Sequence, residues 1–514
     1  MKTIGALFAS LLARLLFPPS PQQRAIFEWF HVGLGNLLVR ARAGTGKTTT
    51  LISALAFAPE KNTLVAAFSR DIADELTQRV KDIPRQPGTK IDARSLHSLG
   101  NGLCWYYLSG KKDGTDVDET RGRRLARKAI ENAGLTPHRE MVTLVAKLAS
   151  LGKNMAPFAK HADLVTIAEK FSVIPDPTFE MEGWTVENIA RLALSAMDLA
   201  TIKEFNSKGQ AVYDYDDQIF LPVRCRWARP KYDLVVIDEA QDMNYTQLLL
   251  AQRVAKGRIV VVGDDRQAIY GFRGADSEAL DRLKTELGAT ELGLTVTFRC
   301  PRKVVMMAQG LVPDYQAAPE APEGTIVTDV SWDGLYKQTE GGDFVLSRTN
   351  APLAVICLHL LRLGKRAFIR GRDVGRELRG IVEKINAETI PQLIEGARLW
   401  AERQVENLKA KSPDGEIEEK KAEAIHDKSE TIIALAEDLA TVPELLARID
   451  SLFTEQKGST STVMCSSIHR AKGLETRRVF LLKDTLRYGS LEEDNIAYVG
   501  ITRAKDTLVL VNGC

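Results

Sequence analysis

The stretch "LLVRARAGTGKTTTLISAL", Leu37 to Leu55, decides how the rest of the chain is interpreted. A short apolar run typical of a buried strand is followed by a glycine-rich loop and then by residues with helical spacing. The pattern GxxxxGK[ST] fits Ala41 to Thr48, with alanine in place of the first glycine. Backbone N–H groups of such a loop, at the N-terminus of a helix, bind phosphates. The strand before the loop and the helix after it favour this reading over a flexible turn.

A second stretch, "VVIDEAQDMNYTQ" from Val235 to Gln247, places three acids directly after an apolar run. These acids either cap the next helix or hold a metal ion, because carboxylates are costly at the end of a buried strand without a cation or water. The phosphate loop favours the metal. We therefore expect Asp238 to hold Mg²⁺ and Glu239 to polarise the attacking water.

The loop supplies the predicted nucleotide site. Lys47 is expected to reach the terminal phosphates and Thr48 to bind Mg²⁺. The residues expected to contact the nucleotide in this loop are Ala43, Gly44, Thr45, Gly46, Lys47, Thr48 and Thr49. Together with the acids, they predict a nucleoside triphosphate hydrolase.

The composition excludes several classes of protein. With 514 residues the chain is too long for one core. Its 69 Lys and Arg against 67 Asp and Glu give a net charge of +2, so a nucleic-acid surface would have to be a local groove. The six cysteines have no close pair, which argues against a zinc ribbon, an iron–sulfur cluster or a disulfide framework. A reducing, intracellular setting is expected.

Short β-branched runs alternate with helical patterns, which indicates parallel α/β layers. One set of expected strands covers 36–41, 63–69, 232–238 and 258–264, and a later set covers 343–349, 366–371, 463–469, 477–483 and 507–513. These two sets of strands predict two α/β cores. Each is interrupted by a polar, helical segment, the first between its second and third strands.

The N-terminal residues 1–17 have apolar residues at helical spacing with Arg14 between them. We expect an amphipathic helix that packs on the body rather than on a partner or a membrane, and not a secretion signal. No apolar run approaches the roughly 20 residues of a membrane span.

Further motifs follow one another along the chain. They are "SPQQRAIFEWF" (20–30), "AAFSRDIADEL" (66–76), "ARSLHSLG" (93–100), "YDYDDQI" (213–219), "GDDRQAIYGFRGA" (263–275), "LTVTFRCP" (294–301), "CSSIHRAKGLE" (465–475) and "NIAYVGITRAK" (495–505). In this order they resemble the motifs of the UvrD/Rep-like branch of superfamily 1 DNA helicases. The resemblance spans about residue 18 to the C-terminus, outside most of the two insertions.

The resemblance implies two RecA-like P-loop NTPase cores of α/β class with parallel sheets, each carrying a mainly helical insertion. The expected ranges are 18–101 with 201–290 for core one, 102–200 for its insertion, 291–372 with 458–514 for core two, and 373–457 for a reduced second insertion. The second insertion is smaller and more charged than in full-length relatives, so processive unwinding is in question. Such compactness suits a phage- or plasmid-borne helicase in the cytoplasm.

The resemblance also assigns roles around the nucleotide. Gln23, with Gln22 as the fallback, would read the adenine, Phe298 would stack on it where the family usually has Tyr, and Glu475 would contact the ribose. Gln267 would sense the terminal phosphate. Arg299 and Arg503 of core two would reach a nucleotide bound to core one and stabilise the charge of the transition state, which an arginine finger can do by about 10³ to 10⁵ in rate.

For single-stranded DNA the resemblance suggests aromatic and basic contacts. The candidates are Phe68, His97, Tyr270, Phe272, Arg273 and His469. Aromatic faces accept any base. Ordinary core aromatics are the alternative, most of all for Phe68 at the end of a strand, and a lone histidine is more often structural.

The leading hypothesis is a monomeric, ATP- and Mg²⁺-dependent 3′→5′ DNA helicase that acts on single-stranded DNA and on single-strand/duplex junctions, with any loading partner unknown. One alternative is a translocase that strips proteins from single-stranded DNA but unwinds little. The other is a nucleotide-gated DNA-binding switch, against which the acid pair and both arginines argue.

Overall fold

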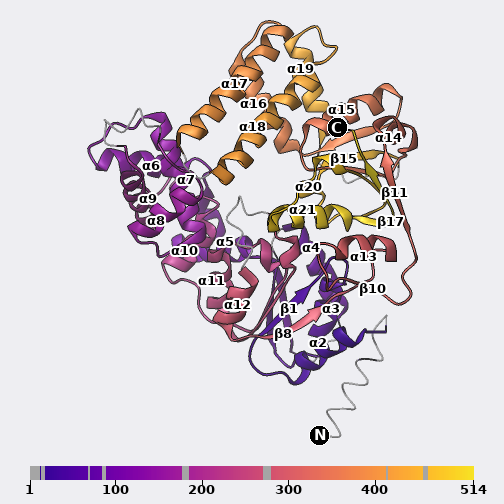
Figure 1. The fold of residues 1–514 in the computed structure, drawn as a ribbon. Helices are drawn as coiled ribbons and strands as arrows, with labels where there is room; N and C mark the ends of the chain where they lie inside the picture. The colour runs from indigo at the N-terminus through magenta and orange to yellow at the C-terminus, as the bar shows by residue number, and fades with distance from the viewer. Residues whose placement is uncertain are drawn as a thin grey trace. The chain divides into compact units, whose positions relative to one another are not determined.

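The computed structural model describes residue 12 and residues 18–67, 70–83, 88–175, 184–269, 279–411, 415–454 and 461–513. Its contacts divide the chain into two units (Figure 1). The first holds Met1–Ala41 with Gly46–Leu294, and the second holds Arg42–Thr45 with Thr295–Cys514. The second unit therefore begins after Leu294, where the sequence had suggested a division after residue 290.

In the first unit the described residues form a six-stranded parallel sheet in the order β3-β2-β6-β7-β1-β8. Its strands are β1 (Leu37–Ala41), β2 (Asn62–Ala67), β3 (Lys90–Ser95), β6 (Tyr232–Ile237), β7 (Ala255–Gly263) and β8 (Thr290–Leu294). A parallel sheet covered on both faces requires nearly continuous apolar strands. Residues Leu234 to Ile237 meet this requirement, since all four are fully buried.

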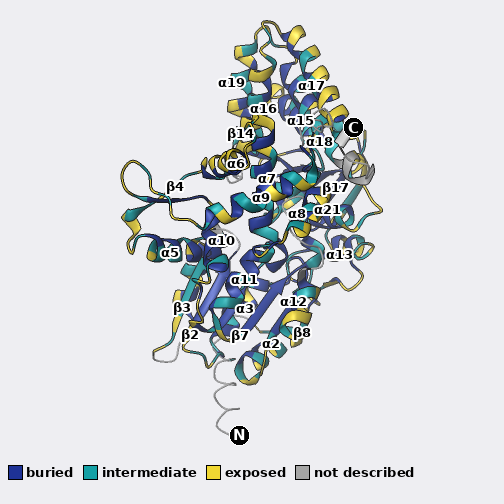
Figure 2. Ribbon diagram, turned by 90° about the vertical axis from the view of Figure 1, so that its left-hand side faces the viewer, coloured by how far each residue is buried: buried dark blue, intermediate teal, exposed yellow. Residues whose placement is uncertain are grey.

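Alternate residues of β6 face two separate cores, because successive side chains of a strand point to opposite faces. Leu234 and Val236 belong to the core that includes residues of three helices, α2 (Pro21–Val32), α3 (Lys47–Leu55) and α4 (Arg70–Arg79). Val235 and Ile237 belong to the core that includes residues of α5 (Leu96–Leu108), α10 (Asp217–Arg224), α11 (Tyr245–Val254) and α12 (Ala279–Leu287). Figure 2 shows the central strands of this sheet mainly in dark blue, between helices whose outer sides are exposed.

A helical insertion separates β3 from β6. It consists of α6 (Arg121–Asn132), α7 (Arg139–Met155), α8 (His161–Lys170) and α9 (Val186–Ala200), with a small parallel pair, β4 (Thr115–Val117) and β5 (Ala211–Tyr213). These helices share their own core with the inner side of α5 and with α10, around the buried Trp184.

In the second unit the described residues form a seven-stranded parallel sheet in the order β11-β17-β16-β12-β15-β13-β14. Its strands are β11 (Thr325–Val330), β12 (Phe344–Ser347), β13 (Ala367–Arg370), β14 (Phe453–Thr454), β15 (Val463–Ser467), β16 (Thr476–Leu482) and β17 (Ala504–Val511). A short parallel pair, β9 (Val296–Thr297) and β10 (Gln316–Ala317), lies outside this sheet.

One core of the second unit joins its sheet to its insertion. Residues of α14 (Trp332–Gln338) and α15 (Ala351–Arg362) pack in it together with the four insertion helices. The latter are α16 (Arg372–Ile385), α17 (Ile390–Lys411), α18 (Gly415–Ala436) and α19 (Val442–Leu452). Three further helices, α13 (Arg302–Gln309), α20 (Ile468–Ala471) and α21 (Leu491–Ile501), pack together through α21.

The structure confirms the predicted α/β class with two parallel sheets and a helical insertion in each. All nine expected strands are present, with ends shifted by up to three residues. The first insertion lies between the expected strands at 63–69 and 232–238, but β3, which was not predicted, precedes it, so the insertion follows the third strand of the chain and not the second. The four outer strands β3, β8, β11 and β14 were not predicted, because the first three have half-exposed residues without a continuous apolar run and β14 has only two residues. Of the predicted N-terminal helix, residues 1–17, all but Leu12 lie outside the described residues.

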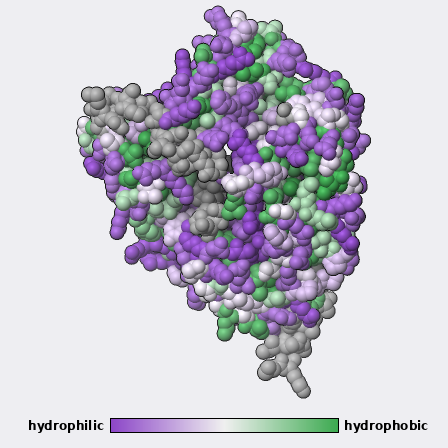
Figure 3. All heavy atoms as spheres, viewed as in Figure 1, coloured by the Kyte–Doolittle hydropathy of each residue, from purple (hydrophilic) through white to green (hydrophobic). Residues whose placement is uncertain are grey.

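Within the described ranges, no helix is both long enough and apolar enough to cross a bilayer. On the face seen in Figure 3, hydrophilic residues predominate, and apolar residues form small groups among them.

Candidate nucleotide and DNA sites

The phosphate loop joins β1 to α3 in the predicted way. Gly44 and Gly46 have φ of 68° and 76°, in the left-handed region that favours glycine. Gly46 caps α3 without a side-chain hydrogen bond to the first turn. The backbone N–H groups that begin α3 therefore remain available for an anion, and the helix dipole favours negative charge there.

Both acids that follow β6 contact the first two residues of α3. Lys47 Nζ lies 3.2 Å from Glu239 Oε2, and Thr48 Oγ1 donates to Asp238 Oδ2 over 3.2 Å. Glu239 has a left-handed backbone with φ of 52°, an uncommon conformation for a residue with a side chain. Its N–H donates to Asp238 Oδ1 over 2.9 Å. The turn after β6 thus directs both carboxylates to the start of α3.

Burial and neighbouring charges shift the pKa values of Asp238 and Lys47. Asp238 is fully buried. Burial and then the charge of Glu239 raise the pKa of Asp238 to about 7. Burial alone would lower the pKa of Lys47, but the carboxylates of Glu239, Asp264 and Asp238 raise it instead. Lys47 is therefore held as a cation against a cluster of acids.

The oxygen atoms of Thr48 and Asp238 fit Mg²⁺. Mg²⁺ prefers hard oxygen ligands and is usually held by one or two protein groups, with substrate phosphates and waters completing its shell. No group of three or more His, Cys, Asp or Glu residues arranged to hold a metal occurs in the part of the chain that the structure describes. A hydroxyl and one carboxylate beside a phosphate loop are the donor set that a nucleotide-bound Mg²⁺ requires.

A chain of side-chain hydrogen bonds connects Glu239 to Gln267. Gln241 Nε2 donates to Glu239 Oε2 over 2.6 Å, and its Oε1 accepts from the N–H of Asp264 over 3.0 Å. Gln267 Nε2 donates to Asp264 Oδ2 over 2.7 Å. The sequence analysis had singled out Glu239 and Gln267 but not Gln241 and Asp264. Only the position of Gln241 in "DEAQD" and of Asp264 in "GDDRQA" could have indicated a role for them.

Gln23 lies against α3. It is the third residue of α2, where it forms a capping box with Ser20. Its Nε2 donates to Thr50 Oγ1 over 3.0 Å, and only 3% of the residue is exposed. This position beside the phosphate-loop helix favours Gln23 over Gln22 as the motif glutamine.

In the second unit, Arg299, Glu475 and Arg503 lie together. Arg299 Nε is 2.5 Å from Glu475 Oε2, and Lys505 Nζ is 3.0 Å from Glu475 Oε1. Arg503 is buried and donates from Nε to the carbonyl of Val499 over 2.8 Å. Burial and then the positive charge of Arg299 lower the pKa of Arg503 to about 10. The two predicted arginine fingers are thus neighbours, and among the described residues the Glu475 carboxylate pairs with Arg299 and not with Arg503.

Arg42–Thr45 of the phosphate loop belong to this second unit. The Ala43 N–H donates to Tyr498 Oη over 2.9 Å, and Tyr315 Oη donates to the Ala43 carbonyl over 3.0 Å. A Cβ added to Gly44 would lie 2.5 Å from Arg299 Cβ, which is closer than real contacts allow. The unit therefore requires glycine at position 44. Phe298, whose N–H donates to the Gly44 carbonyl over 2.9 Å, is 56% exposed.

The predicted DNA contacts are only partly described. Phe68, Tyr270, Phe272 and Arg273 lie outside the described residues. His97 is in the first turn of α5, and burial lowers its pKa. In the second unit, His469 is in α20.

Both histidines are held neutral. For His469, burial and then the charge of Arg348 lower the pKa to about 4. A neutral histidine can still donate one hydrogen bond, so both remain able to contact a phosphate or a backbone group.

The acidic motif "YDYDDQI" forms a buried ion network at the base of the first insertion. Lys153 Nζ lies 3.0 Å from Asp214 Oδ2 and 2.8 Å from Asp217 Oδ1. Asp217 also pairs with Arg121. Burial and then the charge of Asp217 raise the pKa of Asp214 to about 6. This network was not predicted, since its members come from α6, α7, α10 and the loop that precedes α10.

The end of α7 also contacts the segment that follows the acid pair. Thr246 Oγ1 donates to the carbonyls of Lys153 and Asn154 over 2.7 and 2.9 Å. Asn244 Nδ2 donates to Asn154 Oδ1 over 2.9 Å. Hydrogen bonds therefore connect the insertion to the N-terminus of α11, which begins three residues after Asp242.

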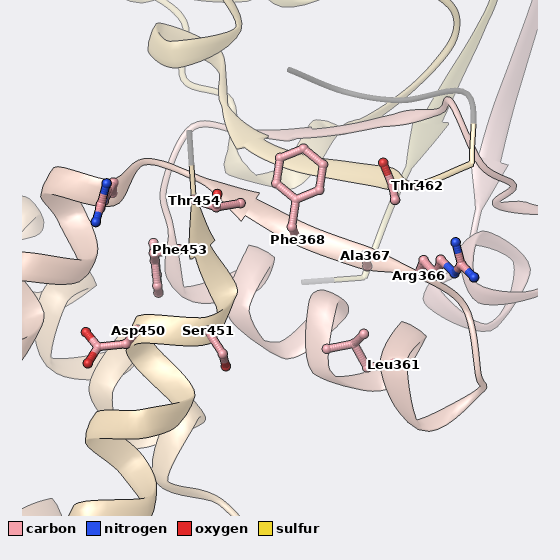
Figure 4. A pocket seen from close by; sticks show the side chains of 10 residues that line it. Leu361, Arg366, Ala367, Phe368, Asp450, Ser451, Phe453, Thr454 and Thr462 are labelled. Atoms are coloured by element: carbon pink, nitrogen blue, oxygen red, sulfur yellow. The ribbon is translucent and has the colours of Figure 1, made fainter. Parts of the chain in front are cut away.

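A pocket of about 720 Å³ lies in the second unit (Figure 4). Its lining comes from α15, β13, α16, α19 and β14 and includes Phe368, Phe453 and Thr462. None of the described residues that were predicted to contact the nucleotide or DNA lines it, so the pocket does not belong to the candidate site.

Comparison with known proteins agrees with this geometry. The family model of the UvrD/REP helicase N-terminal domain matches residues 20–288, and that of the UvrD-like helicase C-terminal domain matches residues 462–511.

Individual relatives are distant in sequence. YjcD of Bacillus subtilis (strain 168) is 24% identical over 93% of this chain and 76% of its own length. The ATP-dependent DNA helicase PcrA of the same organism is 23% identical over 93% of this chain and 81% of its own length. DNA helicase II of Rickettsia typhi is 25% identical over 54% of this chain and 42% of its own length.

The N-terminal model covers more than half of the chain and includes the phosphate loop, the acid pair and the motif that carries Gln267. The chain belongs to the UvrD/Rep family of ATP-dependent DNA helicases.

Proposed function

We propose that this protein hydrolyses ATP to move along single-stranded DNA in the 3′→5′ direction and to separate the strands at single-strand/duplex junctions. The observation that carries the proposal is the pairing of Lys47 with Glu239 and of Thr48 with Asp238 at the start of α3. Family membership supports ATP and DNA as the substrates.

The pairing suggests how ATP binding would prepare hydrolysis. In the free protein the Lys47 ammonium is 3.2 Å from the Glu239 carboxylate. Phosphate oxygens of bound ATP would compete for Lys47. Glu239 would then be released to orient the attacking water and accept its proton, while Gln241 fixes its carboxylate.

Thr48 Oγ1 and Asp238 Oδ2 are the atoms that would hold Mg²⁺. When bound, the ion would offset the charge of the phosphates during transfer. The link from Glu239 through Gln241 and Asp264 would report the state of this site to Gln267.

Arg299 and Arg503 would supply positive charge to the terminal phosphate. Burial and then the charge of Arg299 lower the pKa of Arg503, which supports the proposal that an anion nearby would stabilise its charge. Arg299 would exchange Glu475 for a phosphate oxygen, which leaves Glu475 to contact the ribose. Phe298 would stack on the adenine, and its exposed ring permits this.

The DNA contacts stay a prediction. Phe68, His97, Tyr270, Phe272, Arg273 and His469 are proposed from the family resemblance, and so is the direction of movement. A monomer is proposed as the active form, because the motifs proposed for ATP and for DNA all occur in this one chain.

A second candidate function is translocation along single-stranded DNA with little unwinding. The short second insertion, α16–α19 between β13 and β15, favours it. One experiment with two readouts distinguishes the two functions. Displacement of streptavidin from the end of a biotinylated single strand reports translocation, and displacement of an annealed strand reports unwinding. A helicase does both at similar ATP cost, whereas the alternative does only the first.

A further inference from the structure

A group of basic side chains in the first unit takes no part in the nucleotide site or in the predicted DNA track. It consists of Arg224, Arg226, Arg229, Lys231 and Arg253, with the ring of Phe158 beside them; we call it the arginine surface. It lies where α10 and α11 end, and Figures 1 and 2 show these two helices side by side.

Hydrogen bonds hold the parts of the arginine surface together. The Lys231 N–H donates to the Val254 carbonyl over 2.9 Å, next to Arg253, and the Arg253 guanidinium donates to the Val223 carbonyl. The Arg253 guanidinium and the backbone at Lys231 are therefore held next to each other.

Most of the charge in the arginine surface is uncompensated. Arg224 pairs with Asp198 at 2.8 Å. Among the residues that the structure describes, no carboxylate lies within ion-pair distance of Arg226, Arg229, Lys231 or Arg253. Burial and then the charge of Arg226 lower the pKa of Arg253. Like charges are thus held close together, and an anion that approached them would relieve the repulsion.

Two guanidinium groups are oriented by one aromatic ring. The Phe158 ring is 44% exposed, and its centroid lies 5.1 Å from Arg253 Cζ and 5.8 Å from Arg224 Cζ. Cation–π contacts of this kind hold a guanidinium in place while its N–H groups stay available. Arg226 has a left-handed backbone with φ of 56°, so the turn after α10 is itself specified. The cation–π contacts and the defined turn indicate that Arg224 and Arg253 are preorganised for a ligand.

The arginine surface is remote from the nucleotide residues of its own unit. Lys231 precedes the first residue of β6, and Asp238 follows the last one, Ile237. At about 3.3 Å per residue, the two ends of this strand are roughly 20 Å apart. The arginine surface therefore lies at the amino ends of the parallel strands. Lys47 and His97 lie at the carboxyl ends, since they follow β1 and β3.

We propose that the arginine surface binds the phosphate backbone of DNA, as a contact separate from the nucleotide site and from the single-strand track. This inference rests on the proposed function only in taking DNA as the polyanion. Arginine forks match phosphate geometry, and a phosphodiester chain presents several charges at regular spacing. A folded protein partner fits less well, because stable protein interfaces have an apolar core and the arginine surface offers a single exposed ring.

The test removes the two exposed guanidiniums in the double variant Arg226→Ala/Arg229→Ala. Fluorescence anisotropy measures binding of a labelled single strand and of a labelled blunt duplex, without nucleotide, at several salt concentrations. Each lost phosphate contact lowers the slope of log K against log salt by about 0.7 to 0.9. We expect the slope for the blunt duplex to fall by about 1.5 and its affinity to fall about tenfold at low salt, with little change for the single strand. An equal or larger loss for the single strand would show that the surface is part of the single-strand track and would overturn the proposal of a separate contact.

The matched control is Arg24→Ala/Arg79→Ala, which removes two exposed arginines of the same unit that pair with Glu28 and Glu75. Its slopes should equal those of the unaltered protein. Should the double variant fail to fold, Arg226→Gln and Arg229→Gln singly take its place, each with about half the effect.

An unchanged slope and affinity for both DNA probes would overturn the proposal. So would retention of DNA binding together with loss of binding to a polyglutamate peptide, which would indicate an acidic protein partner. Failure of the proposed function is a separate observation, since it would appear as an absence of DNA-stimulated ATP hydrolysis in the unaltered protein, whatever the salt slopes.

Discussion

Replacement of Lys153 by methionine tests whether the buried ion network holds the first insertion in place. Lys153 is 4% exposed and is the cation between Asp214 and Asp217, the second of which is fully buried. Methionine keeps a flexible apolar side chain of similar length and removes the charge, including the contact of Lys153 Nζ with the Phe220 ring. Loss of one partner from a buried ion pair costs about 3 to 5 kcal/mol, because it leaves an uncompensated charge behind. We expect the melting temperature at pH 8 to fall by at least about 5 °C.

The pH dependence distinguishes this cause from a packing defect. The pKa of Asp214 is already raised to about 6, and removal of the nearby ammonium raises it further. A carboxyl whose folded-state pKa lies above its unfolded value of about 3.9 loses stability as the pH rises through the folded-state pKa. The variant should therefore lose more stability at pH 8 than at pH 5, and Lys153→Met/Asp214→Asn should recover at least half of the loss.

Differential scanning fluorimetry of the full chain at both pH values measures these effects. Lys128→Met, at an exposed position of α6, is the control and should change the melting temperature by no more than about 1 °C. An unchanged melting temperature of Lys153→Met at pH 8, or an equal loss at pH 5 and pH 8, would refute the reasoning.

Three further predictions concern the nucleotide site. Glu239→Gln should abolish steady-state ATP hydrolysis while ATP-dependent binding of single-stranded DNA persists, and unchanged phosphate release would remove Glu239 from the role of base. Arg503→Lys should lower kcat for ATP by about 10³-fold with little change in nucleotide affinity, because lysine lacks the planar fork; a change confined to nucleotide affinity would count against a transition-state role. Gln23→Ala should reduce the preference for ATP over GTP in competition experiments, since Gln23 lies against α3 at Thr50, and an unaltered preference would show that another residue reads the base.

The strands that could be predicted from the sequence are the buried central ones. Residues 232–238 read as a strand because both faces of a parallel sheet are covered and four successive side chains must be apolar. The outer strand β3, "KIDARS", has one buried residue and lacks that pattern, so its existence depends on pairing with β2 and not on local preference.

In the candidate site, too, the contacts within sequence motifs could be predicted, whereas contacts between elements far apart in the sequence could not. The contacts of Lys47 and Thr48 with the acid pair followed from motifs whose spacing fixes the chemistry. The contacts of Gln241, Asn154 and Lys153 did not, because each depends on side chains from elements far apart in the sequence. The arginine surface was visible only once α10 and α11 were known to end side by side.

ATP hydrolysis in the presence and absence of single-stranded DNA, followed by unwinding of duplexes that carry either a 3′ or a 5′ overhang, tests the central claim most directly. The account predicts that single-stranded DNA stimulates hydrolysis and that only the 3′-tailed duplex is opened or traversed. Hydrolysis that does not respond to single-stranded DNA, or unwinding from the 5′ tail alone, would contradict it.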